Sequence, residues 1–249
     1  MYNMFNDINK RYFEPFSNLP FQLKKQISRL LKLFISQKKY KYLDRAVNDR
    51  HLFWGGATPF DEFEILKLYR NNPEEDNYNS QIEPIYSYFK EKKPNNSFID
   101  QITYLELRHR LPELLMMRVD KMAMATSVET RVPFLDHELV EFALSIPDTL
   151  KNKNGIGKYI LKEAARGIVP EFVIDRRKMG FCGSASNMMS GGLLEFAKNE
   201  ILDSDIINDK FNMDYVSYII KSHESNKIDH GMKIFSLLNL SLWSDHWIN

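Results

Sequence analysis

Apolar residues recur at helical spacing along most of this 249-residue chain, and the alternation typical of a strand hardly appears. Helices are expected at about 97–107, 112–126, 136–146 and 157–166, and another should begin near residue 58 and end before Pro73. A sheet needs runs of strand-like residues that this pattern does not supply. The sequence therefore predicts a mainly α-helical chain.

The predicted helix ends carry suitable residue types. A cap residue, a first-turn proline and two acids are expected to begin the helix near residue 58, in the order Thr58, Pro59, Asp61 and Glu62. Asp136 is placed to cap helix 136–146, because Pro133 cannot lie in a helix interior. Gly167 suits the left-handed turn after a helix, with Pro170 three residues on. Loops are expected at 71–80 and 92–97.

The C-terminal stretch, 230–248, predicts a closing helix. Its broad apolar face would hold Ile234, Leu237, Leu238, Leu242 and Trp243. The aromatic residues near its end are more typical of packing than of chemistry, so we interpret Trp243, His246 and Trp247 as structural.

Composition limits the classes of partner. The chain has 34 basic and 33 acidic residues, so its net charge of +1 gives no overall field to attract nucleic acid or an anionic membrane. Residues 21–43 hold seven Lys or Arg among apolar residues, which suits either a basic helix on a membrane or partner, or, as we favour, a surface helix packed by one face. No apolar run approaches the ~20 residues of a membrane span, and the N-terminus does not resemble a secretion signal.

The chain has one cysteine, Cys182. A lone cysteine excludes an internal disulfide and any site built from several cysteines, and it fits a reducing compartment. We therefore expect a cytoplasmic protein.

Charged residues interrupt the apolar pattern near residue 120. Arg118, Asp120 and Lys121 lie among methionines and a valine, so this helix cannot bury every apolar residue without drawing in charge. A buried charge needs a partner or a ligand. Glu129 and Arg131 follow in an extended turn, where alternate residues point the same way and the two side chains can pair.

Three segments together resemble a known family. They are V-D-K-M-A-M-A-T-S-V-E-T-R-V-P-F-L-D-H (119–137), G-K-Y-I-L-K-E-A-A-R-G-I-V-P (157–170) and D-R-R-K-M-G-F (175–181). This set is similar to the C-terminal part of the synthetase domain of glutamine-dependent asparagine synthetases. The resemblance covers roughly residues 50–249. It implies the helical C-terminal portion of an adenine-nucleotide α-hydrolase-like α/β domain, without its nucleotide-binding sheet, over residues 51–249. Residues 1–50 are expected to form an N-terminal helical segment that serves as a linker or interface.

The resemblance implies roles for matching residues. Lys178 would contact the phosphates of ATP and stabilise the charge that grows on the α-phosphate. Glu129 would assist deprotonation of the attacking amine, and Arg131 would orient substrate or act structurally. Further nucleotide- or substrate-binding positions would be Asp120, Lys121, Arg177 and Gly180. Without the resemblance, a solvated basic loop at 176–178 and a structural ion pair between Glu129 and Arg131 are the simpler interpretations.

Two loops of that family do not occur here. The phosphate loop S-G-G-x-D-S is missing, and so is a second, acidic glycine-rich loop that would precede this region. S-G-G-L-L-E at 190–195 lacks both the aspartate and a preceding strand. H-L-F-W-G-G at 51–56 offers only two glycines, which is weak evidence for a phosphate loop. ATP and Mg²⁺ are implied, with the metal-binding acids expected outside this chain. We therefore expect a split subunit, a truncation or an excised domain that is inactive alone.

The expected partner is a polypeptide that carries the missing nucleotide-binding sheet and a glutaminase domain. The expected reaction is adenylation of the aspartate side-chain carboxylate followed by amide formation with ammonia. Two alternatives stay open: an amidotransferase-like enzyme of another biosynthetic pathway, such as that of a surface polysaccharide or a peptide, and a non-catalytic helical interaction module.

Overall fold

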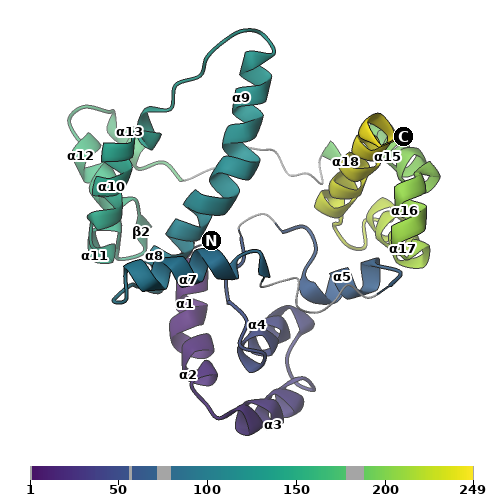
Figure 1. Cartoon of the computed structure of the whole chain (residues 1–249), viewed down its shortest axis with the longest axis horizontal. Helices are drawn as coiled ribbons and strands as arrows, with labels where there is room; N and C mark the ends of the chain where they lie inside the picture. Colours follow the sequence, from purple (N-terminus) through teal and green to yellow (C-terminus); the bar gives the residue numbers. More distant parts are fainter. Residues whose placement is uncertain (1, 56–57, 72–79, 178–187, 249) are drawn as a thin grey trace. The chain divides into compact units, whose positions relative to one another are not determined.

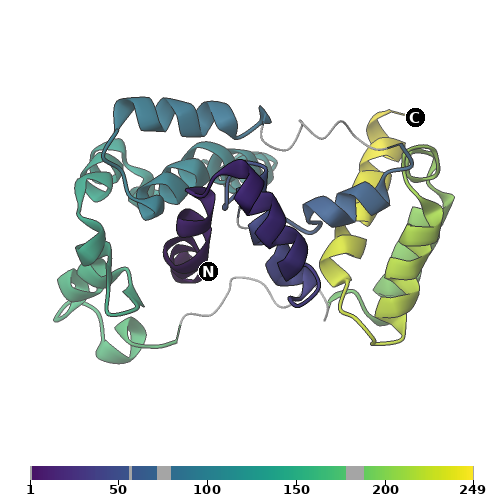
Figure 2. The same ribbon diagram turned by 90° about the horizontal axis from the view of Figure 1, so that it is seen from below.

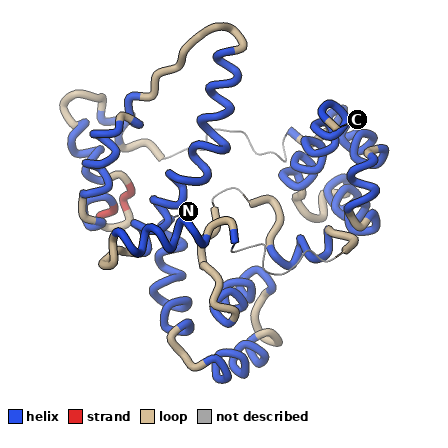
Figure 3. Tube along the Cα trace, in the orientation of Figure 1, coloured by secondary structure: helices blue, strands red, loops and turns tan. Residues whose placement is uncertain are grey.

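The structure, a computed structural model, describes residues 2–55, 58–71, 80–177 and 188–248, and its elements are nearly all helices (Figure 1). Within these ranges the one sheet is an antiparallel pair, β1 (Asn152–Lys153) and β2 (Ile156–Gly157) (Figure 3). The predicted mainly α architecture is confirmed. Among the described helices, none is long and apolar enough to cross a membrane.

The chain packs as two compact units. Unit 1 comprises Met1–Gly56 and Tyr78–Arg176, and unit 2 comprises Ala57–Asn77 and Arg177–Asn249. The expectation of a separate N-terminal segment over residues 1–50 stays a prediction.

Unit 1 begins with short helices, followed by a long one. Its first elements are α1 (Tyr2–Ile8), η1 (Asn9–Phe13), α2 (Glu14–Ser17), α3 (Phe21–Leu31), α4 (Gln37–Val47) and α7 (Glu83–Lys92). One core lies around Phe53, whose ring meets that of Phe5 edge to face at 5.0 Å. The buried members of this core are Phe53, Ile82, Tyr86, Ile102 and Leu105. A smaller core joins α2 to α4 through Phe16, Ala46 and Val47.

Three contiguous segments form the long helix: α8 (Phe98–Leu105), η2 (Glu106–Met116) and α9 (Met117–Met124). Ser97 caps its start, as predicted, by accepting a hydrogen bond from the Asp100 N–H. The predicted break between 107 and 112 is wrong. Pro112 lies inside η2, a wider π-helical segment in which the Met117 N–H donates to the Pro112 carbonyl five residues back. The wider turn accommodates a ring that would clash in an α-helix.

The rest of unit 1 is a set of short elements: η3 (Pro133–Leu135), α10 (His137–Ser145), α11 (Asp148–Lys151), the β1–β2 hairpin, α12 (Tyr159–Ala165) and α13 (Glu171–Ile174). Asp136 caps α10 as predicted, accepting from the N–H groups of Glu138 and Leu139. Gly167 has a φ of +79°, so the predicted left-handed turn after α12 is also confirmed.

Unit 2 is a helical bundle of α5 (Glu62–Leu68), α15 (Gly191–Asp203), α16 (Asp205–Lys210), α17 (Met213–Glu224) and α18 (Gly231–Trp247), and its last helices are drawn in green to yellow in Figure 2. Its core includes Ile201, Val216, Ile219 and Ile234, none of which is exposed. An ion pair between Lys233 and Glu64 joins α18 to α5.

Two expected helix details are wrong in unit 2. Helix α5 begins at Glu62, and its cap is Asp61 instead of Thr58, because Asp61 and Glu64 form a reciprocal capping box. In α18, Ile234, Leu237 and Leu238 are buried as predicted, but Leu242 and Trp243 are 41% and 50% exposed. The buried face continues instead through Ser241 and Ser244, since the small side chains let α18 approach α15 closely.

Residues 21–43 form parts of two helices, α3 and α4, which contact each other. The favoured interpretation, a surface helix packed by one face, holds for α3 in part. Ile27 packs into the smaller core, whereas Leu30 of α3, and Phe34 after its end, are exposed.

Candidate active site

Glu129 and Arg131 lie close together, as the extended turn predicts. The Arg131 Nη2 donates to the Glu129 Oε2 at 2.9 Å, and both side chains are largely exposed. They follow α9 in a stretch without regular structure that leads into η3. An exposed carboxylate with one oxygen held by a guanidinium keeps its other oxygen free to accept a proton or bind a ligand.

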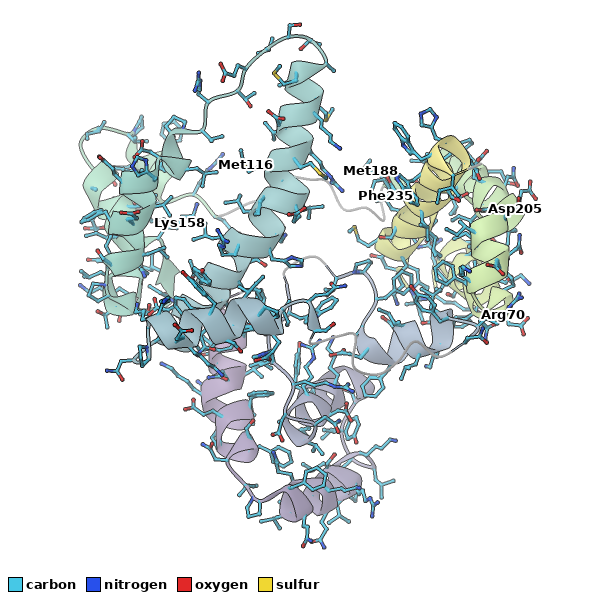
Figure 4. All side chains as sticks on the ribbon, viewed as in Figure 1. Arg70, Met116, Lys158, Met188, Asp205 and Phe235 are labelled. Atoms are coloured by element: carbon cyan, nitrogen blue, oxygen red, sulfur yellow. The ribbon has the colours of Figure 1, made fainter. Side chains whose placement is uncertain are left out.

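Asp120 and Lys121 lie on α9. No residue of α9, charged or apolar, is buried among the described residues, and its side chains project from the ribbon (Figure 4). The expected conflict between burying apolar residues and drawing in charge therefore does not arise there. Its apolar residues are exposed as well, Met122 by 76% and Met124 by 53%. Both the charged and the apolar side chains of α9 are therefore accessible to a ligand or a partner protein.

The basic run begins just after α13. Arg176 and Arg177 are described and exposed, whereas Lys178 and Gly180 lie outside the described residues. Arg177 is grouped with unit 2, while Glu129, Arg131, Asp120 and Lys121 belong to unit 1. Of the predicted site residues, the structure brings together Glu129 and Arg131.

Arg166 holds the residue that precedes the basic run, and the sequence analysis missed it. Its Nη1 and Nη2 donate to the two oxygens of Asp175, each at 3.1 Å, in a fork. Its Nε donates to Glu163 at 3.1 Å, and it also pairs with Glu171. These bonds to Arg166 hold the pKa of Asp175 below its usual range. A signal was present, because acids stand three residues before and five and nine residues after an arginine that ends a predicted helix.

The residues fit the two expected ligands differently. Adjacent exposed cations, Arg176 and Arg177, suit a polyphosphate. For Mg²⁺, the described ranges contain no group of three or more His, Cys, Asp or Glu placed to hold a metal ion. The expectation that the metal-binding acids lie outside this chain stays a prediction.

Two glycine pairs were considered for a phosphate loop, Gly191–Gly192 and Gly55–Gly56. Gly191 and Gly192 begin α15, and neither Met189 nor Ser190 before them is in a strand. In the segment 51–56, Phe53 is fully buried and its carbonyl accepts a hydrogen bond from the Tyr86 hydroxyl at 2.8 Å. Phe53 is thus part of a core, whereas Gly56 lies outside the described residues, so H-L-F-W-G-G stays weak evidence for a phosphate loop.

Comparison with known proteins settles the family. The asparagine synthase family model matches residues 2–245. The chain belongs to the asparagine synthase family. This family match extends to nearly the whole chain, beyond the range of about 50–249 expected from the sequence, and so includes the helices α1 to α4.

Several members of the asparagine synthase family are similar over long stretches. Asparagine synthetase [glutamine-hydrolyzing] 1 of Bacillus subtilis is 33% identical over 243 residues, which cover 95% of this chain and 37% of that protein. A putative asparagine synthetase [glutamine-hydrolyzing] of Mycobacterium bovis is 25% identical over 92% of this chain and 35% of its own length. The human asparagine synthetase [glutamine-hydrolyzing] is 30% identical over 98 residues, 37% of this chain and 18% of that protein.

The chain therefore spans little more than a third of the relatives that match it over most of its length. No solved structure matches it significantly.

Proposed function

We propose that this chain supplies the C-terminal helical part of the synthetase domain in an ATP-dependent amidotransferase of the asparagine synthetase type. One observation carries the proposal: membership of the asparagine synthase family over residues 2–245, a range that includes V-E-T-R-V-P-F and D-R-R-K-M-G-F. The proposed location is the cytoplasm, since a chain with one cysteine suits a reducing compartment.

The proposed reaction has two steps. An oxygen of the aspartate side-chain carboxylate attacks the α-phosphorus of ATP, and pyrophosphate leaves. Ammonia then attacks the carbonyl carbon of the acyl adenylate, AMP leaves, and the nitrogen loses a proton to give the amide. The second step needs a base, and the first needs cations near the phosphates.

Lys178 is the proposed catalytic cation of the first step. Negative charge grows on the α-phosphate as the carboxylate attacks, and a fixed ammonium lowers the energy of that state more than that of the bound ATP. Arg177 is the proposed neighbour that binds phosphate, and Gly180 would let the backbone come close to the nucleotide. Support comes from the motif and from the exposure of Arg176 and Arg177, which immediately precede Lys178.

Glu129 is the proposed base of the second step. Its carboxylate is exposed and keeps an oxygen beyond the one that Arg131 occupies. We assign Arg131 the role of orienting Glu129 or the substrate carboxylate. Asp120 and Lys121, exposed on α9, are proposed to contact nucleotide or substrate.

The remaining part of the synthetase would bind the rest of ATP. We propose that a portion with the loop S-G-G-x-D-S, on a nucleotide-binding sheet, docks against this chain, together with a glutaminase domain as nitrogen source. Four apolar residues of α9 are exposed: Met117, Val119, Met122 and Met124. This exposure supports a partner surface there, because an exposed group of large apolar side chains often marks an interaction site. Mg²⁺ would be held by acids of that portion.

The test begins with a pull-down of this chain from its own source, followed by mass spectrometry for a polypeptide that carries S-G-G-x-D-S. The recovered assembly is then given ATP, aspartate and ammonia, and formation of asparagine and AMP is measured. We expect both products, and we expect Lys178→Ala to abolish them while Lys153→Ala, an exposed lysine of β1, leaves them unchanged.

Other results would contradict the proposal in different ways. Turnover of ATP with another carboxylate, and none with aspartate, would favour an enzyme of another biosynthetic pathway. Full activity of Lys178→Ala would remove the assigned role of that lysine. An assembly that neither binds nor consumes ATP would favour a non-catalytic interaction module.

A further inference from the structure

The segment that carries the basic run leaves unit 1 at a point held by several ion pairs. Asp175 follows α13, and its N–H donates to the Glu171 carbonyl at 2.9 Å. Ile174, one residue earlier, is buried. The backbone is therefore set in place up to Asp175, while Arg176, the next residue, is exposed.

Arg166 is the centre of these ion pairs. It follows α12, and its guanidinium meets three carboxylates: Glu163 at 3.1 Å, Glu171, and both oxygens of Asp175 at 3.1 Å each. Guanidinium and carboxylate are both planar, so a two-point pair fixes orientation as well as distance. A single exposed ion pair restricts the motion of its residues little, but a network that includes a two-point pair restricts it more.

The backbone around Arg166 supports this arrangement. Arg166 forms a bridge with Val169 across the turn at Gly167, whose left-handed φ of +79° suits glycine. This tight turn sends the chain back from α12 into α13. As a result, Glu171 and Asp175 return to the side chain of Arg166.

We propose that Arg166 is a positioning residue for Arg176, the first cation of the basic run. By holding Asp175 in a two-point pair, it sets the direction in which Arg176 leaves α13. The inference rests on the proposed function, because it takes the basic run to be the phosphate-contacting element of the synthetase. Arg166 itself touches no reacting atom in this proposal.

The test uses two variants, one that changes the geometry of the pair and one that changes its charge. Arg166→Lys keeps the positive charge and loses the two-point pair, and Asp175→Asn keeps the shape and loses the negative charge. Lys198→Ala is the matched control, since it removes an ion pair of similar exposure with Glu224 in unit 2, away from the basic run in sequence. All variants are made in the complete assembly.

The first readout does not depend on activity. Hydrogen exchange of the Asp175 amide and the rate of tryptic cleavage after Arg176 report local order. We expect both rates to rise about three- to tenfold in Arg166→Lys and Asp175→Asn, and to stay unchanged in Lys198→Ala. Unchanged rates in both variants, or an equal rise in the control, would overturn the proposal.

The second readout separates positioning from a purely structural role. We expect kcat of Arg166→Lys to fall about three- to tenfold while the KM for aspartate stays the same, because the defect concerns the phosphate side of the reaction. A rise in exchange with unchanged kcat would show that the ion pairs are structural, which overturns the positioning role. Failure of the proposed function would look different, since Lys178→Ala would then be active too while the exchange results would stand.

Discussion

Lys24 lies buried in unit 1 with its Nζ 2.7 Å from the exposed carboxylate of Asp49 and 3.1 Å from the Ala46 carbonyl. It comes from the face of α3 that packs against the end of α4. Asp49 has a φ of +50°, a left-handed conformation that Asp tolerates better than most residues. The pair thus ties α3 to the turn that follows α4.

We expect Lys24→Ala to destabilise unit 1 by about 1–3 kcal/mol, because it removes two hydrogen bonds and leaves the Ala46 carbonyl without one of its donors. Lys25→Ala is the matched control, as Lys25 is the exposed neighbour on the same helix. Urea unfolding of both variants measures the difference. Equal midpoints would show that the buried pair contributes nothing.

Tyr86 provides a second test of the unit 1 core. Its buried hydroxyl donates to the Phe53 carbonyl at 2.8 Å, and its ring stacks on that of His51 with 3.8 Å between centroids. We expect Tyr86→Phe to lower the free energy of unfolding by about 0.5–1.5 kcal/mol. Tyr88→Phe, at an exposed position of the same helix, should leave it unchanged, and a reversed order of the two variants would argue against this core.

His230 should make unit 2 sensitive to acid. Its ring is buried, and neither ring nitrogen has a hydrogen-bond partner among the described residues. Burial first, and then the charge of Lys233, lower the pKa of His230. The folded state therefore takes up a proton less readily than the unfolded state, whose histidine titrates near pH ~6.5. The contribution of His230 to the stability of unit 2 is therefore complete above pH ~6.5. It is lost as the pH falls from there through the lowered pKa of the folded state.

Urea midpoints measured between neutral pH and mild acid test this expectation. His230→Phe should flatten the fall of the midpoint below pH ~6.5, since the titrating group is gone. His246→Gln is the control, because His246 is exposed, and its profile should follow that of the unchanged protein. An identical fall in His230→Phe would assign the acid sensitivity to other groups.

Glu129 and Arg131 should matter for activity and not for stability. Both side chains are largely exposed, so loss of their ion pair should change the free energy of unfolding by less than about 0.5 kcal/mol. Loss of a base in the second step should lower kcat of Glu129→Gln by about a hundredfold or more. Steady-state kinetics of the assembly and thermal unfolding of the chain, taken together, distinguish the two effects. A stable variant with full activity would return the pair to a structural role.

Local signals accounted for the parts of the fold that were predicted well. Ser97 and Asp136 cap helices because their side-chain oxygens reach backbone N–H groups within a few residues, so no distant contact is needed. Thr58 was an equally suitable cap residue by type, but Asp61 caps α5 because Glu64 completes a capping box with it. The sequence signal was right about the helix and wrong by one turn about where it begins.

Features that depend on packing or on widened helical turns were missed. Pro112 normally ends a helix, and nothing nearby in the sequence indicates that a π-helical segment accommodates it. Trp243 belongs to an apolar pattern, yet it is half exposed, because the buried side of α18 is set by what α15 and α17 present to it. The apolar pattern of a helix predicts which residues can be buried, whereas packing against neighbouring helices determines which of them are buried.

The candidate site was predictable only through resemblance. The spacing of Glu129 and Arg131 predicted their ion pair, and the structure confirms that pair. The roles of these residues and of Lys178 stay predictions. Arg166 went unnoticed because Glu171 and Asp175 become its neighbours only when the turn at Gly167 brings α13 back to the end of α12.

The most direct test of the central claim follows an oxygen atom. The assembly that contains this chain is given ATP, ammonia and aspartate labelled with ¹⁸O in its side-chain carboxylate, and the AMP is examined by mass spectrometry. Adenylation of the carboxylate predicts that one labelled oxygen moves into the phosphate of AMP for each asparagine formed, and that Lys178→Ala abolishes this transfer. Asparagine formed with unlabelled AMP, or release of ADP in place of AMP, would contradict the account.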